Sequence, residues 1–261
     1  FGLLTYHTLL FTYCDDMADK ILIYGANGYT GELITRFAAE RGMKPIIAGR
    51  NKAAIEALAA KHGLEYRVFS LDEAAMLDAA LQEVDMVLHC AGPFSITSKP
   101  MVEACLRNKK HYTDITGEIS VFEACAAKEK KAQDAGIMIM PGVGFDVVPS
   151  DCLAKHLNGR LPSASHLSLA WYGMGRMSHG TQATMTMNVG RGGAIRKDGK
   201  ITPVPAAWKT QEIDFGEVKK TGVTIPWGDV STAYYSTGIP NIEVFTVVPQ
   251  SVIKTMKMTR Y

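Results

Sequence analysis

The heptapeptide "GANGYTG" (25–31) directly follows the apolar run "KILIY" (20–24), and this junction decides the fold. Three glycines recur there at intervals of three residues, after a strand-like segment and before a helix-like one. In a dinucleotide-binding turn, the first glycine permits the tight turn, the second lets a pyrophosphate approach, and the third lets helix and strand pack. Backbone N–H groups and the positive end of the helix dipole then face the same anion. The residues expected at this site are Gly25, Asn27, Gly28, Tyr29, Thr30 and Gly31.

The segments that follow alternate between strand-like and helix-like composition as far as about residue 140. Such alternation implies a parallel, doubly wound sheet with right-handed helical crossovers. We therefore expect an α/β fold class with a Rossmann-type doubly wound parallel sheet. The predicted strands cover residues 20–24, 45–49, 65–70, 86–90, 111–115 and 137–141. The predicted helices cover residues 31–42, 51–63, 73–82, 98–108 (with Ser98 as its cap and Pro100 in its first turn) and 120–136.

The regular alternation of strand-like and helix-like segments ends after about residue 149. Residues 166–173 alternate like a half-buried strand, residues 180–200 suggest a helix running into a Gly-rich turn, and residues 201–261 suggest strands and loops. This pattern predicts a second, smaller α+β domain. The expected boundaries are an N-terminal extension at 1–16, a dinucleotide-binding domain at 17–150, and a substrate domain at 151–261.

Composition excludes several function classes. The net charge of +2 over 261 residues gives no strong field that would favour nucleic acid. No apolar run approaches the roughly 20 residues of an integral membrane segment. The five cysteines are odd in number and form no C-x-x-C pair, which argues against a disulfide framework and against a metal site. We expect a cytoplasmic protein with a small-molecule substrate, and a homodimer is left open.

The end of the second predicted strand, "AGRN" (48–51), indicates which cofactor binds. A carboxylate about 20 residues beyond the glycines would bind the ribose 2′-hydroxyl of NAD, but Arg50 and Asn51 stand there instead. A guanidinium pairs with a 2′-phosphate, so NADP is the predicted cofactor. The alternative for Arg50 is a solvated residue at a helix start. Later strand ends add Asp72 near the adenine, and Ala91, Gly92, Pro93 and Phe94 near the nicotinamide.

Several separated motifs together resemble a known family. They are "GANGYTGELI" (25–34), "AGRN" (48–51), "CAGPF" (90–94), "ACLRNKKHYTDITGE" (104–118) and "PGVGFDVVPSD" (141–151). In this order they are similar to the saccharopine dehydrogenase-like NADP oxidoreductases, and most similar to the branch with the trans-acting enoyl reductases. The resemblance covers about residues 17–250. It implies a Rossmann domain, a nicotinamide cofactor and a smaller α+β substrate domain, and it names no substrate.

Hydride transfer to a C=C, C=N or C=O bond needs a nearby proton donor. Asp114 and Glu118 follow the fifth predicted strand and Asp146 follows the sixth, so these three are the candidate catalytic residues. The alternatives are that Asp114 caps a turn and that Glu118 begins the next helix in solvent. A Gly-marked helix start suits a substrate anion, with Ser178, His179 and Thr181 as the candidates.

Three functions follow from these residues. The first is an NADP-dependent oxidoreductase for a small molecule. The second is an enoyl reductase for a hydrophobic, lipid-like enone, for which a Met-rich segment (174–187) would supply an adaptable pocket. The third is a non-catalytic NADP-binding module. Short-chain dehydrogenase chemistry is excluded, because that chemistry needs a Tyr with a Lys four residues later and no Tyr here has one.

Overall fold

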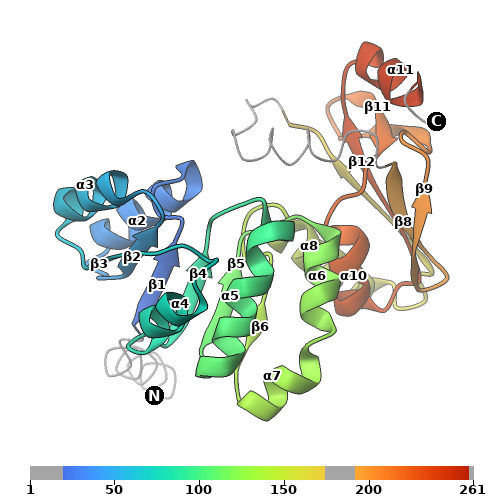
Figure 1. Ribbon diagram of the computed structural model, residues 1–261. Helices are drawn as coiled ribbons and strands as arrows, with labels where there is room; N and C mark the ends of the chain where they lie inside the picture. The colour runs from blue at the N-terminus through green and yellow to red at the C-terminus, as the bar shows by residue number, and fades with distance from the viewer. Residues whose placement is uncertain (1–19, 174–191, 259–261) are drawn as a thin grey trace, which may run out of the picture. The chain divides into compact units, whose positions relative to one another are not determined.

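The computed structural model describes residues 20–173 and 192–258 (Figure 1). Backbone contacts divide the chain into two units, each assembled from separate segments. The first unit holds the chain up to Ala91 together with Pro100–Tyr112 and Ala135–Met138. The second unit holds Gly92–Lys99, Thr113–Asp134 and the chain from Ile139 onward. The domain boundary expected at residue 150 stays a prediction. No helix within the described ranges is long and apolar enough to cross a membrane.

A six-stranded sheet carries the predicted α/β pattern. Its order is β3-β2-β1-β4-β5-β6, and β1 pairs in parallel with both β2 and β4. The strands are β1 (Ile21–Tyr24), β2 (Ile46–Gly49), β3 (Tyr66–Val68), β4 (Met86–His89), β5 (His111–Asp114) and β6 (Ile139–Met140). The expected Rossmann-type fold class is confirmed. The strand order changes direction between β1 and β4, and doubly wound sheets bind their ligands at this switch point.

The helices of this fold follow the predicted order with two differences. They are α2 (Tyr29–Glu40), α3 (Lys52–His62), α4 (Ala74–Leu81), α5 (Phe94–Asn108), α6 (Ile119–Ala126), α7 (Glu129–Ala135) and α8 (Val148–Arg160). Helix α5 begins four residues before the predicted start, so Ser98 is a buried residue inside the helix and not its cap. The single helix predicted over 120–136 is two helices: the Ala127 N–H makes the last α-helical bond of α6, to Glu123 O (3.0 Å), and the Lys128 N–H then donates to Cys125 O, three residues back (2.9 Å), a tighter turn that ends the helix.

Apolar packing on β1 and β2 stabilises the first unit. Ile23 and Ile47 lie next to each other in register on these strands. They form one buried cluster with Ile55 and Leu58 of α3. Gly63 ends α3 in the left-handed conformation (φ 64°), which glycine adopts without the strain that a β-carbon would add. The carboxyl ends of β1 and β2 are thereby held in a fixed register.

The second unit contains a separate, largely antiparallel sheet. Its order is β10-β11-β12-β8-β9, and β7 pairs with β12 in parallel. The strands are β7 (His166–Trp171), β8 (Gly193–Lys197), β9 (Lys200–Val204), β10 (Thr210–Asp214), β11 (Lys219–Thr224) and β12 (Asn241–Val247). Two helices, α10 (Asp229–Thr237) and α11 (Gln250–Met258), accompany this sheet. The expected second α+β region is confirmed, but these helices were not predicted.

The segment 180–200, predicted as a helix running into a Gly-rich turn, is described only from residue 192, and there it forms the first strand and the turn of a β-hairpin. Strands β8 and β9 pair antiparallel on either side of Asp198 and Gly199. Both turn residues have positive φ (50° and 78°), as a two-residue hairpin turn with matching twist requires. The dipeptide Asp-Gly was a sequence signal for this turn.

A buried arginine joins three elements of the second unit. Arg196 of β8 is only 4% exposed. Its guanidinium donates to the carbonyl oxygens of Val230 (2.8 Å) and Gly199 (2.8 Å) and to the carboxylate of Glu123 on α6 (3.1 Å). The ring of Tyr234 lies 4.2 Å from the guanidinium carbon. Because the guanidinium itself is shielded from water, these bonds fix α10 and β8 against α6.

Replacing Arg196 by Met should lower the free energy of unfolding of the second unit by about 3 kcal/mol, because it leaves buried acceptors without a donor. The matched control is Lys130→Met in the same unit, whose exposed ion pair with Asp134 should contribute under about 1 kcal/mol. All three tryptophans lie in the second unit, so their fluorescence in a urea titration reports on that unit. Equal losses in the two variants would contradict the role of Arg196.

Candidate functional site

The glycine turn combines two crowded positions with one open position. Gly25 has φ 81°, and a β-carbon there would lie 2.7 Å from the backbone nitrogen of Ala91. A β-carbon at Gly31 would overlap the carbonyl oxygen of Gly25. At Gly28 the nearest atom would be that same oxygen at 3.3 Å, with no other within 4 Å. Gly25 and Gly31 are therefore required by the fold, and Gly28 leaves an open approach to the backbone.

This open approach lies at the N-terminus of α2. The N–H of Gly28 donates to Gly25 O (3.0 Å), and its carbonyl accepts from Glu32 (2.8 Å) as the helix begins. Tyr29 opens the helix and is 71% exposed. An open glycine at a helix N-terminus fits the pyrophosphate of a dinucleotide. The predicted strand–turn–helix geometry is present.

The end of β2 places the predicted selectivity residues at the same edge. Arg50 is exposed, and no salt bridge within the described ranges involves it. Asn51 accepts a bond from the N–H of Ala54 (3.2 Å) and so caps α3. Burial raises the pKa of Tyr24 to about 12, while the Arg50 charge lowers this pKa and the Asp72 charge raises it. Arg50 and Asp72 therefore both lie near the end of β1, where a cofactor's adenosine would bind.

The loop after β4 begins beside the glycine turn, through the contact between Ala91 and Gly25 described above. Gly92 is exposed, and a β-carbon there would lie 3.5 Å from the Phe94 ring. The peptide bond between Gly92 and Pro93 is cis. Phe94 then begins α5, and its N–H donates to the carboxylate of Glu118 (2.8 Å).

Asp114 and Glu118, two of the candidate proton donors, are engaged with the backbone. Asp114 is fully buried, and its Oδ1 accepts from the N–H groups of Thr116 (3.0 Å) and Gly142 (2.8 Å). This carboxylate ties the loop after β6 to the end of β5. The geometry favours the alternative in which Asp114 caps a turn. Glu118 accepts one backbone bond on each carboxyl oxygen, from the N–H of Phe94 and from the N–H of Ser95 (3.1 Å), so its carboxyl is engaged with the start of α5.

The third candidate, Asp146, lies near a second carboxyl, Asp229, which the sequence analysis did not identify. Asp146 is half-buried, and burial raises its pKa. Its Oδ2 lies 3.1 Å from the β-carbon position of Gly117. Asp229, the first residue of α10, is fully buried. Burial raises the pKa of Asp229 to about 7, against a hydrogen bond from Ser150 that lowers it, and the charges of Asp151 and Asp146 raise it further.

The two contacts of the Ser150 hydroxyl agree with a protonated, neutral Asp229 carboxyl. The Ser150 hydroxyl contacts two acceptors, Val147 O (3.0 Å) and Asp229 Oδ1. A hydroxyl carries one proton and can donate only one bond, so the second contact is satisfied when the Asp229 carboxyl supplies the proton. Little in the sequence indicates that Asp229 is a buried acid, since there is only an acidic residue after "PWG". Its hydrogen-bond partner Ser150 lies 79 residues away along the chain.

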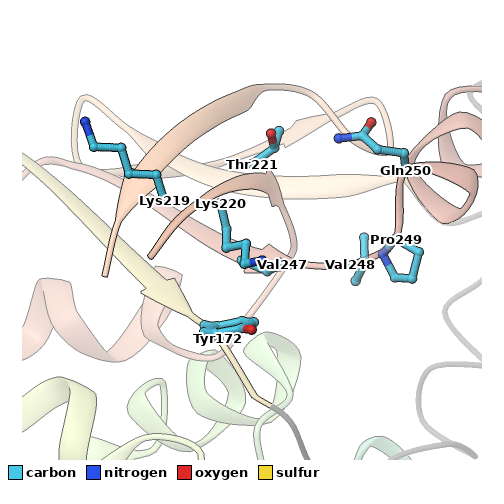
Figure 2. A pocket seen from close by; sticks show the side chains of 8 residues that line it. All are labelled: Tyr172, Lys219, Lys220, Thr221, Val247, Val248, Pro249 and Gln250. Carbon is cyan, nitrogen blue, oxygen red and sulfur yellow. The ribbon is translucent and has the colours of Figure 1, made fainter. Parts of the chain in front are cut away.

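A pocket of about 520 Å³ lies on the second sheet (Figure 2). Lys220 of β11 stands 5.8 Å from the ring of Tyr172, and none of the lining residues is acidic. The lining residues are Tyr172, Lys219, Lys220, Thr221, Val247, Val248, Pro249 and Gln250. None of them was singled out from the sequence. The predicted substrate residues Ser178, His179 and Thr181, and the Met-rich segment, lie outside the described residues.

Comparison with known proteins finds a family-model match in the first part of the chain. Residues 21–140 match the family model described as the saccharopine dehydrogenase NADP binding domain. A saccharopine dehydrogenase-like oxidoreductase of Mus musculus is 27% identical over 214 residues, which cover 71% of this chain and 50% of the relative. A trans-acting enoyl reductase of Mycobacterium ulcerans is 30% identical over 149 residues, covering 54% of this chain and 36% of the relative. The chain thus spans at most about half the length of these curated relatives.

A solved structure supports the fold over most of the chain. Saccharopine dehydrogenase (L-Glu forming) from Saccharomyces cerevisiae, without ligand, matches with a TM-score of 0.66. The match covers 92% of this chain and 57% of that one, at 16% identity. At this identity the likeness establishes the fold alone.

Replacing Gly28 by Val should abolish NADPH binding and leave the chain folded, because the side chain would fill the one open approach in the turn. The matched control is Gly159→Val, since Gly159 of α8 also has open space around its β-carbon position. Titration of NADPH fluorescence checks binding, and circular dichroism checks folding. A folded Gly28→Val protein with normal affinity would place the cofactor elsewhere.

Asp229→Asn should change how stability depends on pH. Between about pH 4 and 7, the folded parent keeps a proton on Asp229 that the unfolded chain releases, so its free energy of unfolding falls as pH rises through this window. Asn keeps the contact with Ser150 and cannot ionise. The variant should therefore gain roughly 2–4 kcal/mol relative to the parent between pH 4 and 8. Urea titrations at several pH values test this, and parallel curves for the two proteins would refute it.

Proposed function

We propose that this protein is an oxidoreductase that transfers a hydride between NADP and a small-molecule substrate, because residues 21–140 match the model of the saccharopine dehydrogenase NADP binding domain. The observation that carries the proposal is the glycine turn. Its two crowded glycines bring the ends of β1 and β4 together, while Gly28 stays open to a pyrophosphate. Arg50, exposed at the end of β2, supplies the charge that a 2′-phosphate needs.

Asp146 is the proton donor that best fits this function. Reduction of a polarised double bond adds a hydride at one atom and a proton at the other. A carboxyl whose pKa is raised holds its proton to a higher pH than an exposed one, and a donor must also reach the substrate. Asp146 is half-exposed, its pKa is raised by burial, and it follows β6 at the end of the sheet where ligands of doubly wound folds bind. Asp114 and Glu118 remain weaker candidates, since their carboxylates are bonded to backbone.

A specific observation also supports a narrower function. Relatives named trans-acting enoyl reductases are 30% identical over about half of this chain, which favours a C=C bond as the hydride acceptor. A hydrophobic, lipid-like enone would be the substrate in that case. A non-catalytic NADP-binding module is the remaining alternative. It predicts cofactor binding without oxidation of NADPH by any acceptor.

Compartment and oligomeric state are proposed on chemical grounds. Among the described residues, Cys105, Cys125 and Cys152 are free thiols, as in a reducing cytoplasmic compartment. A homodimer is supported by the exposed leucines Leu153 and Leu157, which lie one turn apart on α8.

NADPH should bind more tightly than NADH, and Arg50→Ala should remove most of the difference. A charge-assisted hydrogen bond contributes roughly 1.5–3 kcal/mol, so the preference should fall by a factor on the order of 10–100. Fluorescence titration with both cofactors measures this. Arg36→Ala, on the exposed face of α2, is the control and should keep the preference. Equal affinities of the parent protein for NADPH and NADH would contradict the assignment of NADP as the cofactor.

A further inference from the structure

The start of helix α5 has no cap of its own. Any α-helix leaves its first N–H groups without partners inside the helix. Ala91, Gly92 and Pro93 precede this helix, and none of them has a side chain that can accept a hydrogen bond. The Pro93 carbonyl accepts from Ile96 and Thr97, both at 3.1 Å. The N–H groups of Phe94 and Ser95 still require acceptors.

Glu118 provides both acceptors from a position 24 residues along the chain. Its Oε1 lies 2.8 Å from the N–H nitrogen of Phe94, and its Oε2 lies 3.1 Å from that of Ser95. Each carboxylate oxygen thus accepts one backbone bond. The negative charge also lies at the positive end of the 15-residue helix dipole, which adds to the strength of both bonds.

The backbone of Glu118 is itself held in place. Its N–H donates to the hydroxyl of Thr116 (3.1 Å), and its carbonyl accepts from Val121 (2.9 Å) and Phe122 (3.2 Å) as α6 begins. Thr116 in turn donates its N–H to the buried Asp114 at the end of β5. Glu118 therefore connects the start of α5 to β5 and α6 through a chain of short hydrogen bonds.

We infer that Glu118 is a positioning residue, which fixes the loop Gly92–Phe94 in the shape that lines the nicotinamide end of the bound cofactor. This inference rests on the proposed function. The Phe94 ring lies 3.5 Å from the β-carbon position of the exposed Gly92, so a shift of Phe94 moves the wall of this loop. Glu118 touches backbone N–H groups and acts on the cofactor only through them.

Two variants and one control test the inference. Glu118→Ala removes both acceptors, and Glu118→Gln keeps one acceptor oxygen. Glu129→Gln removes a carboxylate from the exposed first turn of α7 and serves as the charge-matched control. The affinities of NADPH and of adenosine 2′,5′-bisphosphate, which lacks the nicotinamide half, are measured for each protein by fluorescence and calorimetry.

Glu118→Ala should weaken NADPH on the order of ten-fold and leave the bisphosphate within about two-fold, with Glu118→Gln in between and the control unchanged. The fluorescence of bound NADPH should also move toward that of the free cofactor. Unchanged NADPH affinity, or an equal loss for both ligands, overturns the inference, because it means no effect or a general disturbance. If Glu118→Ala does not fold, the same comparison with Glu118→Gln decides. A parent that binds neither ligand overturns the proposed function itself.

Discussion

The contact between Gly25 and Ala91 is the constraint on which the rest of the site depends. The turn after β1 approaches the end of β4 so closely that a β-carbon on Gly25 would lie 2.7 Å from a backbone nitrogen. The N–H groups of Gly25 and Ala26 both donate to Ala48 O at the end of β2. Three strand ends therefore meet around one turn. The close backbone contacts of the turn occur at Gly25 and Gly31, whereas Gly28 has few neighbours. The turn can therefore pack against the sheet and still expose the backbone of Gly28 to a ligand.

Carboxylates at the following strand ends divide into two groups by their partners. Asp114 and Glu118 accept backbone N–H bonds from neighbouring loops and helix starts. Asp146 and Asp229 lie where burial dominates and favours the neutral form. The first group can hold loops in position, while the second group can hold protons. The same residue type thus serves structure or proton transfer according to whether a backbone donor is within reach.

Local sequence signals made most of the six-stranded sheet and its helices predictable. The elements that were predicted wrongly or not at all depend on contacts between residues far apart in the sequence. Gly25, Gly28 and Gly31 and the short apolar runs specify the turn and its strands within a few residues of sequence. The start of α5 was misplaced because its cap, Glu118, lies 24 residues away. Helix α10 is rich in β-branched and aromatic residues, which favour strands, and burial of Val230 and Ala233 against β12 overrides that preference. The site residue Asp229 was missed because its burial comes from the same distant packing, whereas Arg50 needed only its place after β2.

Asp146 and Asp229 differ in exposure, and that difference assigns their parts in the proposed reaction. Asp229 has no exposed surface, so no substrate reaches it, although burial raises its pKa to about 7. Asp146 reaches solvent, and its charge raises the pKa of Asp229. Two coupled acids lose their protons in sequence, because the first negative charge opposes the second. If Asp146 gives its proton to a substrate, the charge left behind holds the proton on Asp229 more firmly. Asp146 must then be reprotonated from solvent, which its half-exposed carboxyl can contact.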